Sequence, residues 1–254
     1  MKKKFFKGVY IAALIVCAAS VIVAGFYGFN LFKSRREHET LQSKVQRTVS
    51  TVSTAALKKN PIDFATLQKT NRDVYAWIRI PKTQIDYPIL QAYKEGDSFY
   101  LNHNIKKQYD INGSIYTEMQ NAKDFSDPNT VIYGHNMLDG SMFQNLHKFR
   151  DKSFFNKNRY IYIYTPGHIL KYEIFAAYKS DNRHILNTYN FSDEKVYSEY
   201  LKKAQDPKSL EVNKRTVSLT TKDRIITLST CIGNETEYRY LVQGVLIDDT
   251  LTES

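Results

Sequence analysis

The chain has 254 residues and a formal net charge of +10, and its length leaves room for one sizeable folded domain. Seven of the ten excess charges lie in residues 1–36, which contain no acidic residue. From Glu37 onward, 29 basic residues stand against 26 acidic ones. The charge therefore does not indicate a nucleic-acid-binding surface.

The N-terminal part is predicted to be a membrane anchor. Residues 1–8 are rich in lysine, and residues 9–32 carry no charged side chain. A helix of about 20 apolar residues crosses a bilayer core, whereas a cleaved signal peptide has an apolar core of only about 7–15. The length predicts an uncleaved single span. Basic residues follow the segment as well, so the charge rule alone does not set its orientation. We expect residues 1–8 to be cytoplasmic and the folded part to be extracellular.

A helical lead-in is predicted for residues 33–60. Apolar side chains recur there every three or four residues, which is typical of one helix face. They are Leu41, Val45, Val49, Val52 and Ala56. Pro61 ends this pattern, and residues 61–254 are expected to form one domain that begins with a short helix over 63–70.

From Val74 the apolar period changes to two, which predicts strands. The expected strands are 74–80, 85–90, 113–116, 130–133, 159–164, 169–178, 225–231 and 238–247. Helices are expected over 141–148 and over 192–205, the second with Ser192 as its N-cap. The pattern favours a mostly antiparallel β-barrel or sandwich with helices at the N-terminus and on one flank.

The two cysteines are Cys17, inside the apolar segment, and Cys231. Cys231 therefore has no partner for an intrachain disulfide. A lone thiol is either a small buried hydrophobe or a reactive group. The sequence has no Cys pair and no His-Glu-x-x-His, so no metal-ligand spacing is visible.

Three chemically active side chains are placed at strand ends. His135 follows Gly134 and the strand predicted over 130–133. Cys231 ends the strand predicted over 225–231, and Arg239 lies at the start of the strand predicted over 238–247. The loop over 232–237 is short, so the Cys231 and Arg239 strands are predicted to form a hairpin. We expect both side chains at the same rim.

At these residues the sequence resembles the class B sortases. The shared motifs are Val74-Tyr75-Ala76-Trp77-Ile78, Ile85-Asp86-Tyr87-Pro88-Ile89, Gly113-Ser114-Ile115-Tyr116, Tyr133-Gly134-His135-Asn136 and Leu228-Ser229-Thr230-Cys231. The resemblance covers nearly the whole chain. It implies a mainly β fold with added helices, in which a closed barrel of about eight strands follows N-terminal helices and one long helix precedes the catalytic strand.

The resemblance also implies roles for individual residues. Cys231 is similar to the nucleophile, His135 to the general acid and base, and Arg239 to the residue that stabilises the substrate carbonyl and the oxyanion. Four further residues are implied as substrate-binding: Ser229, Thr230, Leu101 and Asn136.

Structural alternatives exist for several of these residues. Without the other two residues, the favoured interpretation of His135 would be a loop histidine that forms a structural hydrogen bond. Arg239 could form a surface ion pair with Glu235 or Glu237, of about 0–1 kcal/mol. Ser229 and Leu101 could face the core.

The activity implied by the resemblance is that of a membrane-anchored transpeptidase. It would cleave a C-terminal Asn-Pro-x-Thr-(Asn/Gly)-like signal after Thr, form a thioacyl enzyme, and join the protein to an amine of a peptidoglycan precursor. The implied partners are surface proteins with that signal, the cell-wall amine and the membrane, with no nucleic acid and a monomeric catalytic domain. No metal or organic cofactor is implied.

Two rival functions remain open. The first is a cysteine protease that only hydrolyses, although papain-like enzymes place Cys before His and here His135 comes first. The second is a non-enzymatic anchored β-domain with a buried Cys231.

Overall fold

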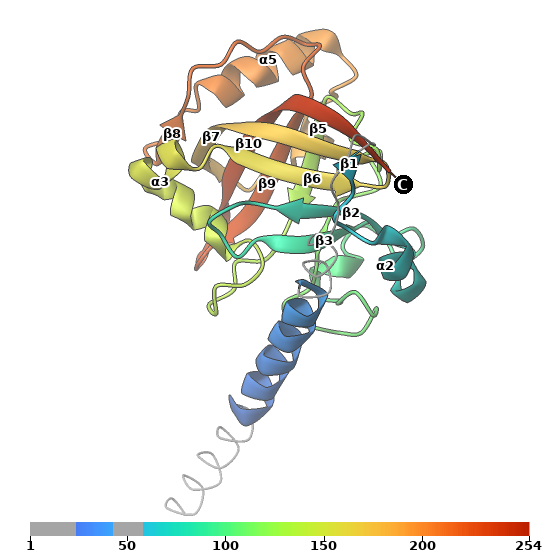
Figure 1. Cartoon of the computed structure of the whole chain (residues 1–254). Helices are drawn as coiled ribbons and strands as arrows, with labels where there is room; N and C mark the ends of the chain where they lie inside the picture. Colours follow the sequence, from blue (N-terminus) through green and yellow to red (C-terminus); the bar gives the residue numbers. More distant parts are fainter. Residues whose placement is uncertain (1–23, 43–57, 254) are drawn as a thin grey trace, which may run out of the picture. The chain divides into compact units, whose positions relative to one another are not determined.

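The computed structural model describes residues 24–42 and 58–253, and the chain divides into two compact units, 1–41 and 42–254 (Figure 1). Residues 24–41 of the first unit are helical. No helix among the described residues has the length and apolar character needed to cross a membrane. The predicted anchor lies outside the described residues over 9–23, and so does the predicted lead-in over 43–57.

The end of the predicted lead-in is extended rather than helical. Lys58–Lys59 form strand β1, which pairs in parallel with the last strand of the chain. The Asn60 side chain donates to the Thr165 carbonyl at 2.7 Å and to the Thr252 hydroxyl at 3.4 Å. These long-range bonds hold this stretch against the sheet. The helical periodicity of the sequence could not predict them.

Within the described residues, eight strands close into a barrel. Their order is β10-β9-β5-β4-β3-β2-β6-β7, and β7 pairs back with β10. They are β2 (Val74–Arg79), β3 (Asp86–Leu90), β4 (Ile115–Tyr116), β5 (Asn129–Tyr133), β6 (Tyr160–Thr165), β7 (His168–Asp181), β9 (Ile225–Ile232) and β10 (Glu235–Glu253). The closing pair confirms the predicted barrel and excludes the sandwich. Most pairs are antiparallel, but β3–β4 and β5–β9 are parallel.

Short elements complete this unit. They are α2 (Phe64–Thr70), η1 (Phe99–Leu101), η2 (Gln144–Arg150), α3 (Lys152–Lys157), α4 (Ile185–Thr188), α5 (Glu194–Gln205) and the edge strand β8 (Val212–Lys214). The helix predicted over 141–148 is the 3₁₀ helix η2, displaced toward the C-terminus. The N-cap of α5 is Asp193 and not Ser192, because the Asp193 carboxylate accepts from the Lys195 and Val196 amides and so satisfies N–H groups that lack a partner inside the helix.

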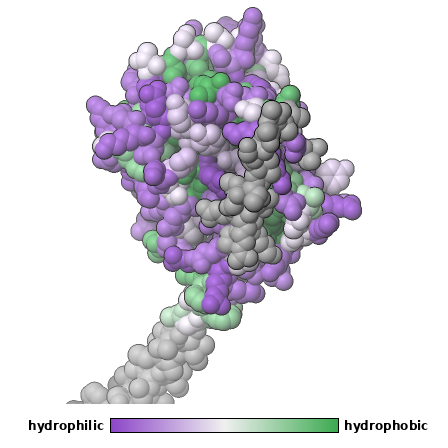
Figure 2. Space-filling model, viewed as in Figure 1, coloured by the Kyte–Doolittle hydropathy of each residue, from purple (hydrophilic) through white to green (hydrophobic). Residues whose placement is uncertain are grey.

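Alternating side chains divide the apolar residues between two faces of the barrel wall. Inward-facing residues such as Ile132, Leu228 and Val242 form the main core. Outward-facing residues such as Ile225 and Leu241 pack against α5, which lies across this side of the barrel (Figure 1). The visible outer surface is mostly hydrophilic, with apolar side chains in small patches (Figure 2).

A buried polar network locks α5 to this outer face. Gln243 of β10 donates to the Tyr200 hydroxyl of α5 and to the Thr227 hydroxyl of β9, both at 2.9 Å. Thr227 donates in turn to Asn129 of β5 at 2.9 Å. Apart from the Asn129 Nδ2, which is buried without a hydrogen-bond partner among the described residues, these groups satisfy one another, and this offsets most of the cost of burying them. The network therefore fixes β5, β9 and β10 relative to one another, and these strands lead to the candidate site.

Candidate active site

The β9–β10 hairpin brings Cys231 and Arg239 together. The two residues are direct partners in the antiparallel register, so their side chains share one face of the sheet. Every residue of β9 is buried except Cys231, which is partly exposed. Since α5 covers the outer face further down these strands, the thiol lies where that cover ends. The predicted hairpin and shared rim are confirmed.

The parallel pairing of β5 with β9 sets the level of His135. Tyr133 is the register partner of Ser229, and the Gly134 amide donates to the Ser229 carbonyl at 3.2 Å. His135, two residues after Tyr133, therefore follows at the level of Cys231, two residues after Ser229. The topology thus places all three predicted catalytic residues at one end of the barrel.

Gly134 permits the tight packing at this end of β5. A Cβ at this position would lie 2.4 Å from Ile115 Cδ1 and 2.8 Å from ring atoms of Phe143. Both neighbours are essentially fully buried. A side chain here would therefore displace either the core or the backbone that carries His135.

The His135 ring is oriented by the last residue of η1. Its Nε2 lies 2.6 Å from the Leu101 carbonyl oxygen, and because a carbonyl only accepts, Nε2 carries the proton. In the neutral ring this leaves the Nδ1 lone pair to accept a proton, and in the cation both nitrogens donate. Nδ1 can therefore accept a proton when the ring is neutral and donate one when the ring is a cation.

Arg239 is held by backbone carbonyls near it in the chain, and it forms no ion pair with a carboxylate among the described residues. Its Nη1 donates to the Thr236 carbonyl at 3.0 Å and to the Tyr238 carbonyl at 2.8 Å. Glu235, one of the two partners considered from the sequence, instead pairs with Lys179. The guanidinium therefore keeps its positive charge uncompensated by Glu235, on the face it shares with Cys231.

Two tyrosines for which the sequence predicted no role adjoin the site. Tyr116 of β4 stacks on Tyr133 of β5 with ring centroids 5.4 Å apart. Burial raises the pKa of Tyr116, the charges of Glu118 and Cys231 raise it further, and Arg239 lowers it. The Tyr116 hydroxyl is thus within electrostatic reach of both Cys231 and Arg239. The signal that could have indicated them is the alternation of side chains along a strand, which sets the face of Tyr116 in Gly-Ser-Ile-Tyr and of Tyr133 in Tyr-Gly-His.

A polar contact joins two segments beside these tyrosines. His184, at the start of α4, places Nε2 2.9 Å from Glu118 Oε1, and its ring lies 6.5 Å from that of Tyr133. Burial raises the pKa of Glu118, while the hydrogen bond and charge of His184 oppose that rise. These residues are 66 positions apart, and the sequence pattern gave no reason to pair them.

The four residues implied as substrate-binding have different environments. Leu101 is 43% exposed, so it is not a core residue, and Asn136 adjoins His135 and forms a bridge with Met142. Ser229 is largely buried but lies on the Cys231 face of β9. Thr230 is 2% exposed and points into the barrel, on the side of Leu228 and Ile232. The structure therefore separates Thr230 from the other three, because successive strand residues face opposite sides.

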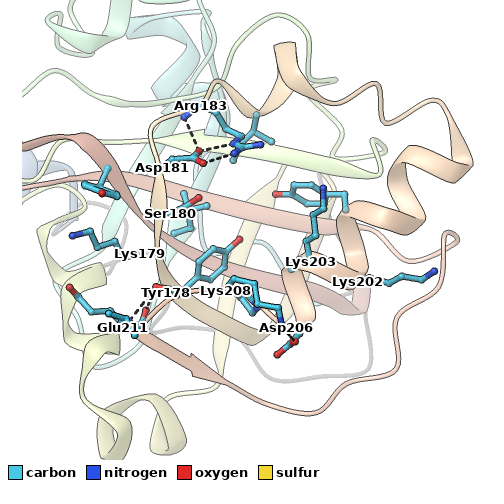
Figure 3. Close-up of a pocket in the computed structure, with 18 of the residues that line it drawn as sticks. Tyr178, Lys179, Ser180, Asp181, Arg183, Lys202, Lys203, Asp206, Lys208 and Glu211 are labelled. Carbon is cyan, nitrogen blue, oxygen red and sulfur yellow. Dashed lines mark hydrogen bonds and ion pairs between the residues drawn. The ribbon is translucent and has the colours of Figure 1, made fainter.

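A cavity of about 820 Å³ lies between α5 and the β7–β10 pair, and its lining does not include Cys231, His135 or Arg239 (Figure 3). Two ion pairs lie within its lining. Arg183 donates to Asp181 at 2.7 Å, as drawn in Figure 3, and Lys208 donates to Asp206 at 2.5 Å. Among the described residues, no cluster of His, Cys, Asp and Glu could hold a metal ion.

Comparisons with known proteins agree on one family. The sequence profile of the sortase domain matches residues 78–247. Sortase B of Listeria monocytogenes is 36% identical over 253 residues, covering 97% of this chain and 99% of the relative. The crystal structure of Clostridium perfringens sortase B is 34% identical, with a TM-score of 0.66 over 73% of this chain and 100% of that one. A Staphylococcus aureus sortase B–substrate complex is 30% identical, with a TM-score of 0.71 over 85% and 97% of the two chains.

Proposed function

Because the chain belongs to the sortase family and is a class B sortase, a cysteine transpeptidase, we propose that Cys231, His135 and Arg239 perform the transfer. The observation that carries this assignment is the strand register. It pairs Cys231 with Arg239 and brings β5 alongside β9 so that His135 follows at the same level. These side chain types supply a nucleophile, a proton carrier and a fixed cation at one rim.

In the first half of the reaction, the Cys231 thiolate attacks the carbonyl carbon of a substrate Thr. The oxyanion that forms accepts hydrogen bonds from the Arg239 guanidinium, which stays charged and offers donors in a fixed plane. As the peptide C–N bond breaks, the His135 cation gives its proton to the leaving amine. The products are a thioester on Cys231 and a free C-terminal fragment.

In the second half, an incoming amine attacks the thioester carbonyl. His135, now neutral, takes a proton from this amine, and the C–S bond breaks to return the Cys231 thiolate. The net change is the exchange of one amide for another, with no redox step. Water in place of the amine would give the hydrolysis that the rival protease function requires.

The substrate is proposed to be a surface protein with an Asn-Pro-x-Thr-(Asn/Gly)-like signal near its C-terminus, and the acceptor an amine of a peptidoglycan precursor. This assignment is supported by the class B motifs quoted above. The complex of Staphylococcus aureus sortase B with a substrate supports a substrate-binding site on this fold.

The test is product analysis by mass spectrometry with the full-length chain. A library of signal peptides would be incubated with and without a glycine-peptide amine. We expect cleavage after Thr and an acyl–amine conjugate only when amine is present. Cys231→Ala should abolish both products, whereas Cys17→Ala, the matched control at the other thiol, should keep them. Cleavage without conjugate would support the protease, and full turnover by Cys231→Ala would refute the assigned nucleophile.

The membrane anchor and the extracellular position of the catalytic domain are proposed from the uncharged run over residues 9–32. Fractionation of cells that express the full chain should recover it with membranes, and external protease should degrade the barrel in intact protoplasts. Recovery in the soluble fraction, or protection from external protease, would contradict this proposal.

A further inference from the structure

The parallel β5–β9 ladder ends just before the nucleophile. The Ser229 carbonyl accepts a hydrogen bond from the Gly134 amide at 3.2 Å. Carbonyls along a strand alternate in direction, so the Cys231 carbonyl, two residues on, points to the same side. However, β5 ends at Tyr133, so this strand does not continue to offer a donor there. An unpaired carbonyl at this position would leave the end of β9 poorly held.

A histidine from a different element occupies that position. His147 of η2 places its Nε2 3.0 Å from the Cys231 carbonyl oxygen. Because a carbonyl only accepts, this nitrogen carries the proton. The other nitrogen, Nδ1, is buried and has no hydrogen-bond partner among the described residues, as fits a neutral ring with its single proton on Nε2.

The surroundings of His147 keep the ring in place and uncharged. It packs on Tyr240 of β10 with ring centroids 5.0 Å apart. Burial lowers the pKa of His147, and the charge of Arg150 adds to this, while the bond to the Cys231 carbonyl and the charge of Glu211 oppose it. The chain around η2 also contacts the second catalytic residue, since the Phe143 amide donates to the His135 carbonyl at 2.8 Å.

We propose that His147 is a positioning residue for the transfer reaction: its Nε2–H replaces, at the Cys231 carbonyl, the strand hydrogen bond that β5 no longer supplies. This inference rests on the proposed role of Cys231. One short segment then braces the backbones of both the nucleophile and the proton carrier. His147 acts through the backbone of Cys231 and touches neither substrate nor the reacting atoms.

The test compares two side chains of similar length, of which only one donates. His147→Gln can present an amide N–H at about the same number of bonds from Cα, whereas His147→Met fills the same space without a donor. The matched control is Asn213→Ala. Asn213 donates to the Phe149 and Arg150 carbonyls, both at 2.8 Å, so its loss loosens the same segment without touching Cys231.

Steady-state kinetics with the full-length chain and a signal peptide give the readout. We expect His147→Met to lower kcat by about 10- to 100-fold with little change in KM, since small displacements of a reacting group have effects of this size. His147→Gln should stay within about threefold of the parent if the donor is what matters. Asn213→Ala should keep the parental kcat even if it lowers stability.

The possible outcomes separate the inference from its premise. A parental kcat in His147→Met, or equal losses in the Met, Gln and Asn213→Ala variants, would overturn the role of the donor. If the Met variant does not fold, a kcat of His147→Gln reduced as much as 10- to 100-fold would do the same. Cys231→Ala is measured in parallel: turnover by that variant would instead refute the proposed function, while its inactivity beside an unaffected His147→Met would refute this inference alone.

Discussion

Replacing Gly134 with Ala should impair the enzyme more than it impairs the fold. The added methyl would lie 2.4 Å from Ile115 Cδ1 and 2.8 Å from the Phe143 ring, far inside normal contact distance. Overpacking of this kind costs about 1–3 kcal/mol, which a domain with a stability of about 5–15 kcal/mol survives. The strain falls on the residue before His135, so part of it will be relieved by moving the imidazole.

The assay combines urea unfolding with peptide turnover. We expect the free energy of unfolding of Gly134→Ala to drop by about 1–3 kcal/mol and kcat to fall by about 10- to 100-fold. Gly244→Ala is the matched control, because Gly244 lies in β10, away from His135, and its Cβ would meet Tyr172 Cβ of β7 at 3.1 Å. It should lose stability but keep kcat.

A second substitution tests the cause of the loss. Ile115→Val removes the Cδ1 atom that lies closest to the new methyl, so the double variant Gly134→Ala, Ile115→Val should regain part of both stability and kcat. The Phe143 contact remains, so recovery should be incomplete. A Gly134→Ala variant with parental stability and turnover would refute the reasoning that this glycine sets the position of His135.

Three further predictions concern other parts of the unit. Arg239→Lys should lower kcat by about 10²–10³-fold, since a lysine lacks the planar pair of donors, while urea unfolding stays close to that of the parent; a kcat within a factor of two would argue against an oxyanion role. For Glu118, whose pKa is raised from 4.5 mainly by burial, the folded state binds the proton more tightly, so this group's contribution to stability falls as pH rises above about 4.5. Glu118→Gln should flatten that dependence in urea unfolding between pH 4 and 7, and an unchanged slope would contradict the assigned cause. Asp193→Ala should cost about 1 kcal/mol through loss of the α5 N-cap, which thermal unfolding would detect; no change would mean that this cap does not stabilise α5.

The sequence predicted those features that depend on local pattern. The period of two from Val74, together with the continuous apolar run over 225–231, located the eight barrel strands. The short loop after Cys231 predicted the hairpin that pairs it with Arg239. The same period, applied to β9, would also have placed Thr230 on the inner face, away from Cys231.

Features that depend on long-range contacts were not predictable in this way. The β7–β10 pair that closes the barrel and the contact of His184 with Glu118 join segments that are distant in the chain. The bond from His147 to Cys231 spans 84 positions, and no periodicity or spacing records it. The extended conformation at Lys58–Lys59 likewise follows from bonds made by Asn60 to the far end of the sheet.

The central claim is that the Cys231 sulfur carries the acyl group between the two substrates. The most direct measurement is peptide mapping by mass spectrometry after rapid acid quench of the full-length enzyme with a signal peptide and no amine. We predict a peptide containing Cys231 whose mass is increased by the acyl fragment ending in Thr, and which disappears when a glycine-peptide amine is added before the quench. An adduct on another residue, or turnover with no adduct on Cys231 at any quench time, would contradict the account.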